Sequence, residues 1–553
     1  MTPFARATST ATGATMPGGP GFSRRRLLQV IGLAGGLAVA GPALAACSPD
    51  DESDGAGRRL DSLTVALPSS ISTLDVTREA GIINYVIALL CLEGLTAIGA
   101  DGALAPSLAT AWTQPDPLTY VYKLRPDVTF SDGNPLTADD VIASIEVNSR
   151  KGSTSALAYA YAPMKSVKAT ADDEITFTLS TPTSGFGWVP SPSTLQVSSR
   201  AFLDEHGDKV GTPQALLLGT GPYVVTEFAP DSHVVLERND AWWGGRVEVA
   251  KVRLDFITDE NTRLLAMRDG SVDIALSVPP NQVKDWQAID GVSIETATDN
   301  SLVTLAFNTS VAPWSDPKVR TAVAHCIDRP AVVESVLRGN AEVALTIPTT
   351  EQWGGLLTKS QVDDLYASIP QVDFDLDAAA SLLAESSVPD GFSATLTYPN
   401  SGPLIGRALL TLAENLKGLG IDLKVQEITL EQWIADLGKH AGIAVGWYFP
   451  GTGDPAEYVQ LLLNGAYAES GGTNLAEYRN AEVTALLDQE VAQTDPAKRG
   501  DLLGQALVKA AADVAYQPLW WAKTATAFGP GLQAEDFGPY FFLGPWVQHV
   551  TTA

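Results

Sequence analysis

The residues best suited to binding chemistry follow an apolar segment near the end of the chain. Residues 443–447 predict a buried strand, and the loop after it combines Trp447, Tyr448 and Asp454 with two glycines. In open α/β sheets, ligands lie beyond the carboxyl ends of strands. Aromatic rings at such a place can line or stack on a ligand, and a carboxylate can anchor a cation. An Asp before a Pro is as often a turn former, so both roles stay open for Asp454.

Residue patterns typical of catalysis are missing from the sequence. It has no Gly-x-Ser-x-Gly elbow, no HExxH motif, no Walker loop and no CxxC pair. The five histidines are scattered singly, and His325 stands beside Cys326 in a helical pattern, which favours a satisfied helical side chain over a metal ligand. Chance pairs among 64 acidic residues leave an exported hydrolase as an alternative. We therefore predict a protein that is not an enzyme and has no metal or cofactor.

Length and charge narrow the class of protein further. A chain of 553 residues is too long for one ordinary core, which predicts at least two domains. The formal net charge is −28, and the first 46 residues hold four arginines and no acid, which leaves −32 for the remainder. A body this acidic would be repelled by nucleic acid, so we expect no nucleic-acid partner. The acidity itself fits solubility.

The first 47 residues have the composition of a targeting segment. Arg24 and Arg25 form a twin-arginine pattern, and a Gly- and Ala-rich apolar run follows and ends in Leu-Ala-Ala-Cys47. That ending resembles the lipobox of bacterial lipoproteins, which implies lipidation at Cys47; a cleaved signal with an incidental Cys is the alternative. Residues 48–60 read as a flexible tether. No later apolar run reaches about 18 residues, the length that a membrane span needs.

The segment from Trp112 to Ile145 has the clearest secondary-structure signals in the sequence. Residues 119–124 alternate with period two, which predicts a strand, and Asp132-Gly133 offers a turn. Thr137 stands three residues before Asp140, the spacing of a capping box, and apolar positions follow at helical intervals. The order is therefore strand, turn, extended run and capped helix.

The residues of this segment resemble the sequence signature of the peptide and nickel family of extracytoplasmic solute-binding proteins. Members of that family deliver solutes to ABC importers. That signature has a Trp, an alternating Tyr-rich strand ending in Leu-Arg, a Phe, an Asp-Gly and then Pro-Leu-Thr-Ala-Asp-Asp-Val, all present here in order. The resemblance covers most of residues 62–530. Its further landmarks are Gly219–Tyr223, Glu237–Trp243, Ala266–Ile274, Phe307–Arg329 and Tyr516–Trp521.

The resemblance implies an α/β, two-lobed periplasmic-binding-protein fold of type II, with hinge-linked lobes around a ligand cleft and an extra subdomain in lobe 1. The expected layout is a signal segment at 1–47, a tether at 48–60, a lobe 1 core from 61–100, 219–305 and 518–553, an appended subdomain at 101–218, and lobe 2 at 306–517. The sequence of the expected lobe 2 also alternates between predicted strands and helices. A strand at 394–398, a helix at 404–416 and a strand at 421–428 predict a βαβ unit.

The resemblance also implies a function. The protein would be an exported monomer, lipid-anchored at the outer face of the cytoplasmic membrane. It would capture a solute, by default a peptide, and deliver it to permease subunits that work with a cytoplasmic ATPase. Metal chelates and oligosaccharides are alternative solutes in the family. We expect ligand contacts from Trp447, Tyr448 and Asp454, and from Asn308 and Arg78.

One departure from the family concerns the ligand's amine. Dipeptide-binding relatives carry an Asp three residues after the Trp, where this chain has Pro450 in a loop that is one residue longer. Asp454 is the candidate replacement, and the loss of the amine clamp is the alternative. Arg78, Arg407 and Arg479 are the candidates for a contact with the ligand's carboxylate. Cys91 and Cys326 fall in apolar helical patterns of different lobes, which predicts two buried free thiols.

Overall fold

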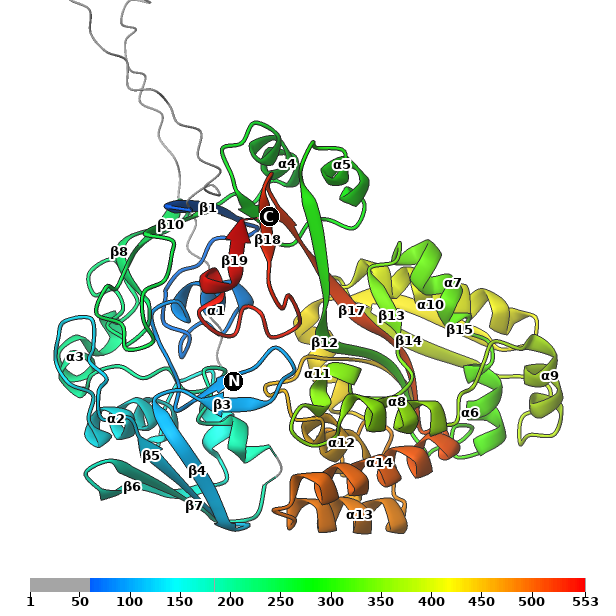
Figure 1. The fold of residues 1–553 in the computed structure, drawn as a ribbon. Helices are drawn as coiled ribbons and strands as arrows, with labels where there is room; N and C mark the ends of the chain where they lie inside the picture. Colours follow the sequence, from blue (N-terminus) through cyan, green and yellow to red (C-terminus); the bar gives the residue numbers. More distant parts are fainter. Residues whose placement is uncertain (1–59, 184, 553) are drawn as a thin grey trace, which may run out of the picture. The chain divides into compact units, whose positions relative to one another are not determined.

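The computed structural model describes residues 60–183 and 185–552, so the predictions for Arg24, Arg25 and Cys47 lie outside the described residues. Within them, strands from distant parts of the chain join in one large mixed sheet (Figure 1). The strand order is β16-β12-β17-β11-β1-β10-β9-β8, and β13 also pairs with β17. These strands are β1 (Ser62–Leu67), β8 (Tyr223–Ala229), β9 (His233–Arg238), β10 (Lys251–Phe256), β11 (Ile274–Ala275), β12 (Ser293–Phe307), β13 (Ala341–Val343), β16 (Ile443–Tyr448) and β17 (Tyr516–Phe528).

Two long antiparallel strands, β12 and β17, join the β1 side of this sheet to its β16 side. Residues 293–298 of β12 pair with 523–528 of β17, and the register shifts before pairing resumes at Leu302. Asn300, inside the shift, has a left-handed φ of 58°. The two sides of the sheet bury separate hydrophobic clusters. The bulge therefore lies where two cores meet on a shared pair of strands.

A separate antiparallel sheet carries the predicted strand and capped helix. Its order is β4-β5-β7-β6, and it shares a buried core with α2, in which Tyr122 and Phe177 pack edge to face at 5.7 Å. Thr137 Oγ1 accepts a hydrogen bond from the Asp140 N–H at 3.3 Å, and the Asp140 carboxylate accepts one from the Thr137 N–H at 2.9 Å. The capping box is therefore confirmed. The elements are β4 (Ala109–Asp116), β5 (Thr119–Leu124), β6 (Met164–Ala171), β7 (Glu174–Leu179) and α2 (Ala138–Ser149).

The β16 side of the large sheet is covered by helices on both faces (Figure 1). β14 and β15 pair in parallel through α10, which confirms the predicted βαβ unit. α10, whose apolar positions recur at helical spacing, buries Leu409, Leu412 and Leu416 in one cluster. The elements are β14 (Ser393–Pro399), α10 (Pro403–Lys417), β15 (Asp422–Ile428), α11 (Leu430–Leu437), α12 (Ala456–Leu463), α13 (Ala481–Val491) and α14 (Pro496–Asp513).

One predicted helix is shorter than its apolar pattern suggested. Residues 81–95 were expected to be helical, but α1 ends at Ala88. The chain then turns, and the carbonyl oxygens of Leu90 and Cys91 accept hydrogen bonds from the N–H groups of Tyr223 and Gly221, at 3.0 and 2.9 Å. Cys91 and Cys326 are both free and buried, as predicted. The remaining helices and strands are α1 (Ile82–Ala88), β2 (Thr96–Ile98), β3 (Leu104–Pro106), α3 (Arg200–His206), α4 (Glu260–Arg268), α5 (Val283–Gln287), α6 (Pro317–Ala324), α7 (Arg329–Ala331), α8 (Lys359–Ser368), α9 (Leu376–Ala384), β18 (Leu532–Ala534) and β19 (Val550–Thr552).

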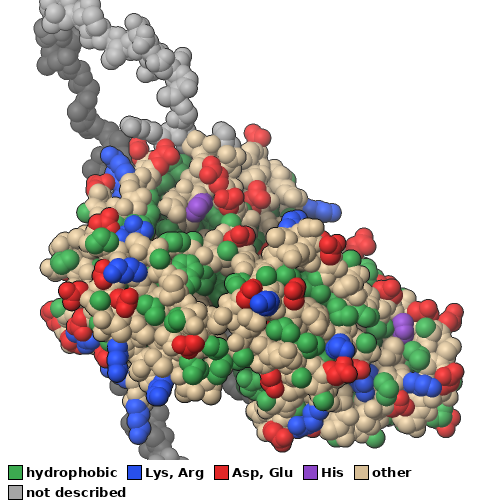
Figure 2. Space-filling view, turned by 60° about the horizontal axis from the view of Figure 1, so that its bottom comes forward, with side chains coloured by type: hydrophobic (Ala, Val, Ile, Leu, Met, Phe, Trp, Pro, Cys, Tyr) green, Lys and Arg blue, Asp and Glu red, His purple; other side chains and the backbone are tan. Residues whose placement is uncertain are grey.

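The charged side chains and the helices of the described residues have the following distribution and length. Figure 2 shows acidic and basic side chains interspersed over one face, with hydrophobic side chains gathered between them and no large basic patch. Among the described residues, no helix combines the length and the apolar character that crossing a membrane requires. The described residues also contain no group of three or more potential metal ligands, and His325 Nδ1 lies 2.6 Å from the carbonyl oxygen of Asp373.

Candidate functional site

The two aromatic residues that end β16 point to opposite faces of the sheet. β16 pairs antiparallel with β12, so successive side chains alternate. Trp447 packs on the cluster that contains α10 and lies 5.1 Å, ring to ring, from the exposed Phe449. Tyr448 packs on the other cluster, with its ring 6.0 Å from Tyr458. Trp447 and Tyr448 therefore do not line one pocket side by side.

The carboxylate of Asp454 forms a turn and an ion pair within the protein. Its Oδ1 accepts a hydrogen bond from the Ala456 N–H at 2.9 Å, which is the turn-forming role. Its Oδ2 lies 3.0 Å from Arg499 Nη2, and that guanidinium also lies 2.7 Å from Glu490 Oε1. Burial alone would lower the pKa of Arg499, but the two carboxylates outweigh it and the pKa is raised. The cation that Asp454 anchors in this structure is thus Arg499.

The loop between β16 and α12 is held by the helix that follows it. Glu457, in the first turn of α12, accepts hydrogen bonds from the N–H groups of Gly451 and Thr452, at 2.9 and 2.8 Å, and from the Thr452 hydroxyl at 2.6 Å. Burial raises the pKa of Glu457, although these donors lower it. A loop fixed in this way presents its outer edge in one conformation.

Glycines let this loop approach the β1 side closely. A Cβ at Gly453 would lie 2.9 Å from the Tyr540 ring and even closer to Trp188, and a Cβ at Gly451 would collide with the Tyr159 hydroxyl. Trp188 and Tyr540 are themselves neighbours, with ring centroids 5.8 Å apart. The Tyr540 hydroxyl also donates a hydrogen bond to the carbonyl oxygen of Glu351 at 3.4 Å. The loop therefore meets the β1 side on an aromatic surface.

A cavity of about 380 Å³ opens beside this contact. One wall comes from residues 103–188 and the other from residues 354–499. Trp112, Tyr120 and Trp188 contribute aromatic surface from the appended sheet and its neighbouring loop, while Asp454 and Arg499 contribute a buried ion pair from the other side. A pocket with mostly fixed walls, aromatic surface and a few charged groups is the usual form of a solute site.

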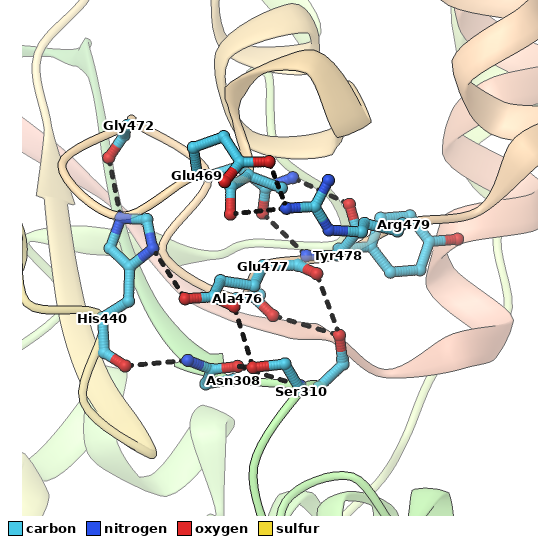
Figure 3. Close-up of polar contacts among 12 residues, drawn as sticks. Asn308, Ser310, His440, Glu469, Gly472, Ala476, Glu477, Tyr478 and Arg479 are labelled. Atoms are coloured by element: carbon cyan, nitrogen blue, oxygen red, sulfur yellow. Dashed lines mark hydrogen bonds and ion pairs between the residues drawn. The ribbon is translucent and has the colours of Figure 1, made fainter.

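Asn308 and Arg78 lie away from this cavity. The Asn308 side chain is buried; it donates to the carbonyl oxygen of His440 at 2.8 Å and accepts from the Ser310 N–H at 2.9 Å (Figure 3). Both of its polar atoms are thus used in joining loops. Arg78 donates to the carbonyl oxygen of Asp208 and lines a different cavity, of about 430 Å³, within the β1 side. Arg479 pairs with the exposed Glu469 at 2.9 Å.

The structure adds residues that sequence reasoning missed. Arg499, Glu457, Trp188, Tyr540 and Tyr159 all contact the candidate loop. Arg499 and Asp454 are 45 positions apart, and Trp188 and Tyr540 are more distant still from the loop. The one usable signal was the pair of glycines at 451 and 453, since glycines one residue apart in a binding loop suggest close approach by another surface.

Comparisons with known proteins decide the class of protein. Residues 103–470 match the bacterial extracellular solute-binding proteins, family 5. The chain belongs to this family. It is 27% identical to Protein XP55 of Streptomyces lividans over 499 residues, 86% of each chain, and 24% identical to the glutathione-binding protein GsiB of Shigella flexneri, covering 83% of this chain and 88% of GsiB. Heme-binding protein A of Haemophilus influenzae is 27% identical, with 73% and 76% covered.

Solved structures of family members share the fold. HbpA2 from Haemophilus parasuis superposes with a TM-score of 0.79 at 21% identity, covering 89% of this chain and all of that one. DppA from Helicobacter pylori, a periplasmic binding protein in complex with the peptide STSA, gives a TM-score of 0.68 at 21% identity, covering 89% and 98%. The predicted α/β, two-lobed binding-protein fold is thereby confirmed. This chain is an extracytoplasmic solute-binding protein of the kind that serves ABC importers.

Proposed function

We propose that this family 5 protein captures a peptide between its two lobes and delivers it to an ABC-type permease, without covalent chemistry. The observation that carries this proposal is the cavity with walls from both sides of the sheet, next to the glycine-mediated contact of the 451–454 loop. Lobe 1 comprises 61–100, 219–305 and 518–553 with the appended subdomain 101–218, and lobe 2 comprises 306–517. The lobes move as rigid units about β12 and β17.

The bulge in β12 supports this hinge assignment. Asp299 accepts from the Ser301 N–H at 2.9 Å and from its hydroxyl at 2.6 Å, so the turn is held locally while the ladder to β17 is interrupted. Hinges are short segments that absorb a backbone change between two packed units. Only a few residues need to rotate here, because each lobe buries its own core.

We assign the ligand contacts to Trp447 and to the outer edge of the 449–454 loop, which adjoins the cavity at Asp454, although Trp447 itself does not line that cavity. Phe449 is 59% exposed and its ring is tilted against that of Trp447 at 5.1 Å, so the pair offers aromatic surface for a side chain of the solute. Asp454 contributes indirectly, since it shares the buried guanidinium of Arg499 with Glu490 and holds the start of α12 through its turn. With Pro450 at the position of the family's amine clamp, peptide main-chain groups are the contacts expected to dominate.

A non-peptide solute is the second candidate. Relatives with 24–27% identity are named for binding glutathione and heme, so the same fold accepts different chemistries in the family. Neither name transfers directly to this chain, whose 449–454 loop departs from the dipeptide-binding pattern. The nature of the solute is therefore the first property to test.

Native mass spectrometry of the purified protein, followed by identification of the co-purified species, tests the proposal. A ladder of peptide masses is the expected result, and a single non-peptide species would overturn the peptide assignment. Trp447→Ala should weaken the identified solute about 30-fold, equivalent to about 2 kcal/mol for a buried aromatic contact, and Trp447→Phe should weaken it much less. Turnover of a peptide, ester or glycoside by the wild-type protein would contradict a purely binding role.

We also propose that the protein is exported through the Arg24-Arg25 signal and anchored by a lipid on Cys47 as a monomer. The support is the order of signal, apolar run and lipobox-like ending in the sequence. Cys47→Ala should shift the protein from the membrane fraction to the soluble exported fraction. Retention of the variant in the membrane would overturn the anchor.

A further inference from the structure

A third cavity lies wholly within the β1 side and has no lining residue from 306–517. It measures about 290 Å³ and lies between the segment after α1, the loop after β9 and the C-terminal segment that follows β18. Aromatic rings make up much of its wall: Trp242, Trp243, Tyr540, Phe541 and Trp546. Its walls come from these segments and from Pro192, which are far apart in the chain, so the cavity is formed by the folded lobe itself.

The floor of this cavity holds a buried carboxylate. Glu93 is 6% exposed and accepts hydrogen bonds from Trp243 Nε1 at 2.9 Å, from the Thr220 hydroxyl at 2.7 Å and from Trp242 Nε1 at 3.3 Å. All three donors are neutral groups. They orient the carboxylate without supplying a compensating charge, and a carboxylate has about four acceptor positions, so capacity for one more donor remains.

The charges around the cavity favour a cation. The lining includes two acids, Glu93 and Asp536, and the single histidine His549, but no Lys or Arg. The guanidinium of Arg125 lies over the Trp243 ring at 4.2 Å and donates to the carbonyl oxygen of Ser107. Trp243 thus already takes part in one cation–π contact, and the aromatic wall offers further ring surface.

We propose that lobe 1 carries a binding site for a small organic cation, an amine or quaternary ammonium, between Glu93 and the surrounding aromatic rings. Ring faces attract ammonium groups, and the buried carboxylate adds an opposite charge when it is ionised. A bare metal ion fits less well, because the described residues provide no group of three metal ligands there. The cavity has no lining residue from 306–517, although its Tyr540 also meets the 451–454 loop. The carboxylate of Glu93 lies on neither wall of the 380 Å³ cavity, so this inference does not depend on which solute the cleft binds.

Isothermal titration of the full chain with choline tests the site, with 3,3-dimethylbutan-1-ol as the neutral probe of the same shape. Choline is expected to bind at least tenfold more tightly than the alcohol, because only choline has charge to interact with Glu93 and the rings. Equal binding of both probes, or no binding of choline, would overturn the proposal. Titrations of the cleft solute are run separately, so a failure of one assignment is distinguishable from a failure of the other.

Two charge-neutralising variants locate the effect. Asp536 is exposed with φ of 56°, a conformation that Asn tolerates, so Asp536→Asn should fold normally and weaken choline about threefold. Asp231→Asn, at an exposed position with φ of 64° outside the cavity, is the matched control and should leave choline binding unchanged. Glu93→Gln should weaken choline at least tenfold. Unchanged binding in both Asp536→Asn and Glu93→Gln, with circular dichroism showing folded protein, would overturn the assignment.

Discussion

Two buried acidic sites in this protein are stabilised in different ways. In lobe 2, Asp454 and Glu490 share the guanidinium of Arg499, so opposite full charges meet within 3.0 Å. In lobe 1, Glu93 accepts its hydrogen bonds from two indole N–H groups and one hydroxyl, and Arg125 acts on it from a distance, without a direct ion pair. Both sites satisfy their hydrogen bonds, but only the first compensates its charge nearby.

The difference appears in the titration behaviour and in the availability of each carboxylate. Burial raises the pKa of Glu93 from its usual 4.5 to about 7, even though its hydrogen bonds and Arg125 act in the opposite direction. Arg499 instead keeps its proton firmly, with a raised pKa. An ionised carboxylate that is held only by neutral dipoles is stabilised further by a nearby cation, whereas one already paired with arginine gains little. This contrast is why we place a cation site at Glu93 and not at Asp454.

Replacing Arg499 by Met should have the largest effect on stability. It leaves Asp454 and Glu490 buried without their cation, which costs about 3–5 kcal/mol of unfolding free energy. Urea denaturation followed by circular dichroism measures the loss. Arg479→Met is the matched control, because Arg479 pairs with Glu469 at an exposed position and such pairs contribute less than about 1 kcal/mol. Equal losses in the two variants would show that burial does not set the cost.

Glu93→Gln should reveal the uncompensated carboxylate through its pH dependence. The folded protein holds the Glu93 proton up to about pH 7, whereas the unfolded chain releases it near 4.5. The stability contribution of wild-type Glu93, relative to Gln, is therefore fully present below pH 4.5 and is lost as the pH rises through 7, by about 3 kcal/mol. Denaturation series at pH 4.5 and pH 8 measure the change. A difference between the two proteins that is the same at both pH values would contradict it.

The fold was predictable where the sequence has strong local patterns. The strand at residues 119–124 and the helix after Thr137 follow from alternation and from a capping box, both of which depend on neighbouring residues. The βαβ unit around α10 likewise follows from periodicity. The helix expected at 81–95 ends at Ala88, and the carbonyl oxygens of Leu90 and Cys91 pair with the N–H groups of Tyr223 and Gly221, a contact between distant segments.

The candidate site was only partly predictable for the same reason. The loop after β16 could be located, because it follows a buried strand. The opposite directions of Trp447 and Tyr448 also follow from strand alternation, since the two are adjacent in one strand. By contrast, nothing near Asp454 in the sequence indicates that Arg499 neutralises it, or that Trp188 and Tyr540 face the loop. Such pairings are decided by tertiary packing.

Thr220→Val should test whether neutral donors hold the Glu93 carboxylate. The fully buried hydroxyl of Thr220 donates to Glu93 at 2.7 Å, and its loss should cost about 2 kcal/mol at pH 8, where the carboxylate is charged. The pKa of Glu93 should also rise further, because one of the groups that lower it is gone. The cost should be smaller at pH 5, and Thr220→Ser should restore most of the stability. A cost independent of pH would point to packing alone.

Thr452→Val removes a hydroxyl donor from a third buried acid, Glu457. It should have the smallest effect on stability of these substitutions. Glu457 loses the Thr452 hydroxyl at 2.6 Å but keeps the N–H groups of Gly451 and Thr452, which the substitution leaves in place. Thr452 is only partly buried, so water can replace the lost donor, and the expected cost is about 1 kcal/mol. Urea denaturation, with Thr452→Ser as control, measures it. Because the backbone donors fix the loop, affinity for the cleft solute should change less than twofold; a larger loss would show that the hydroxyl itself positions the loop.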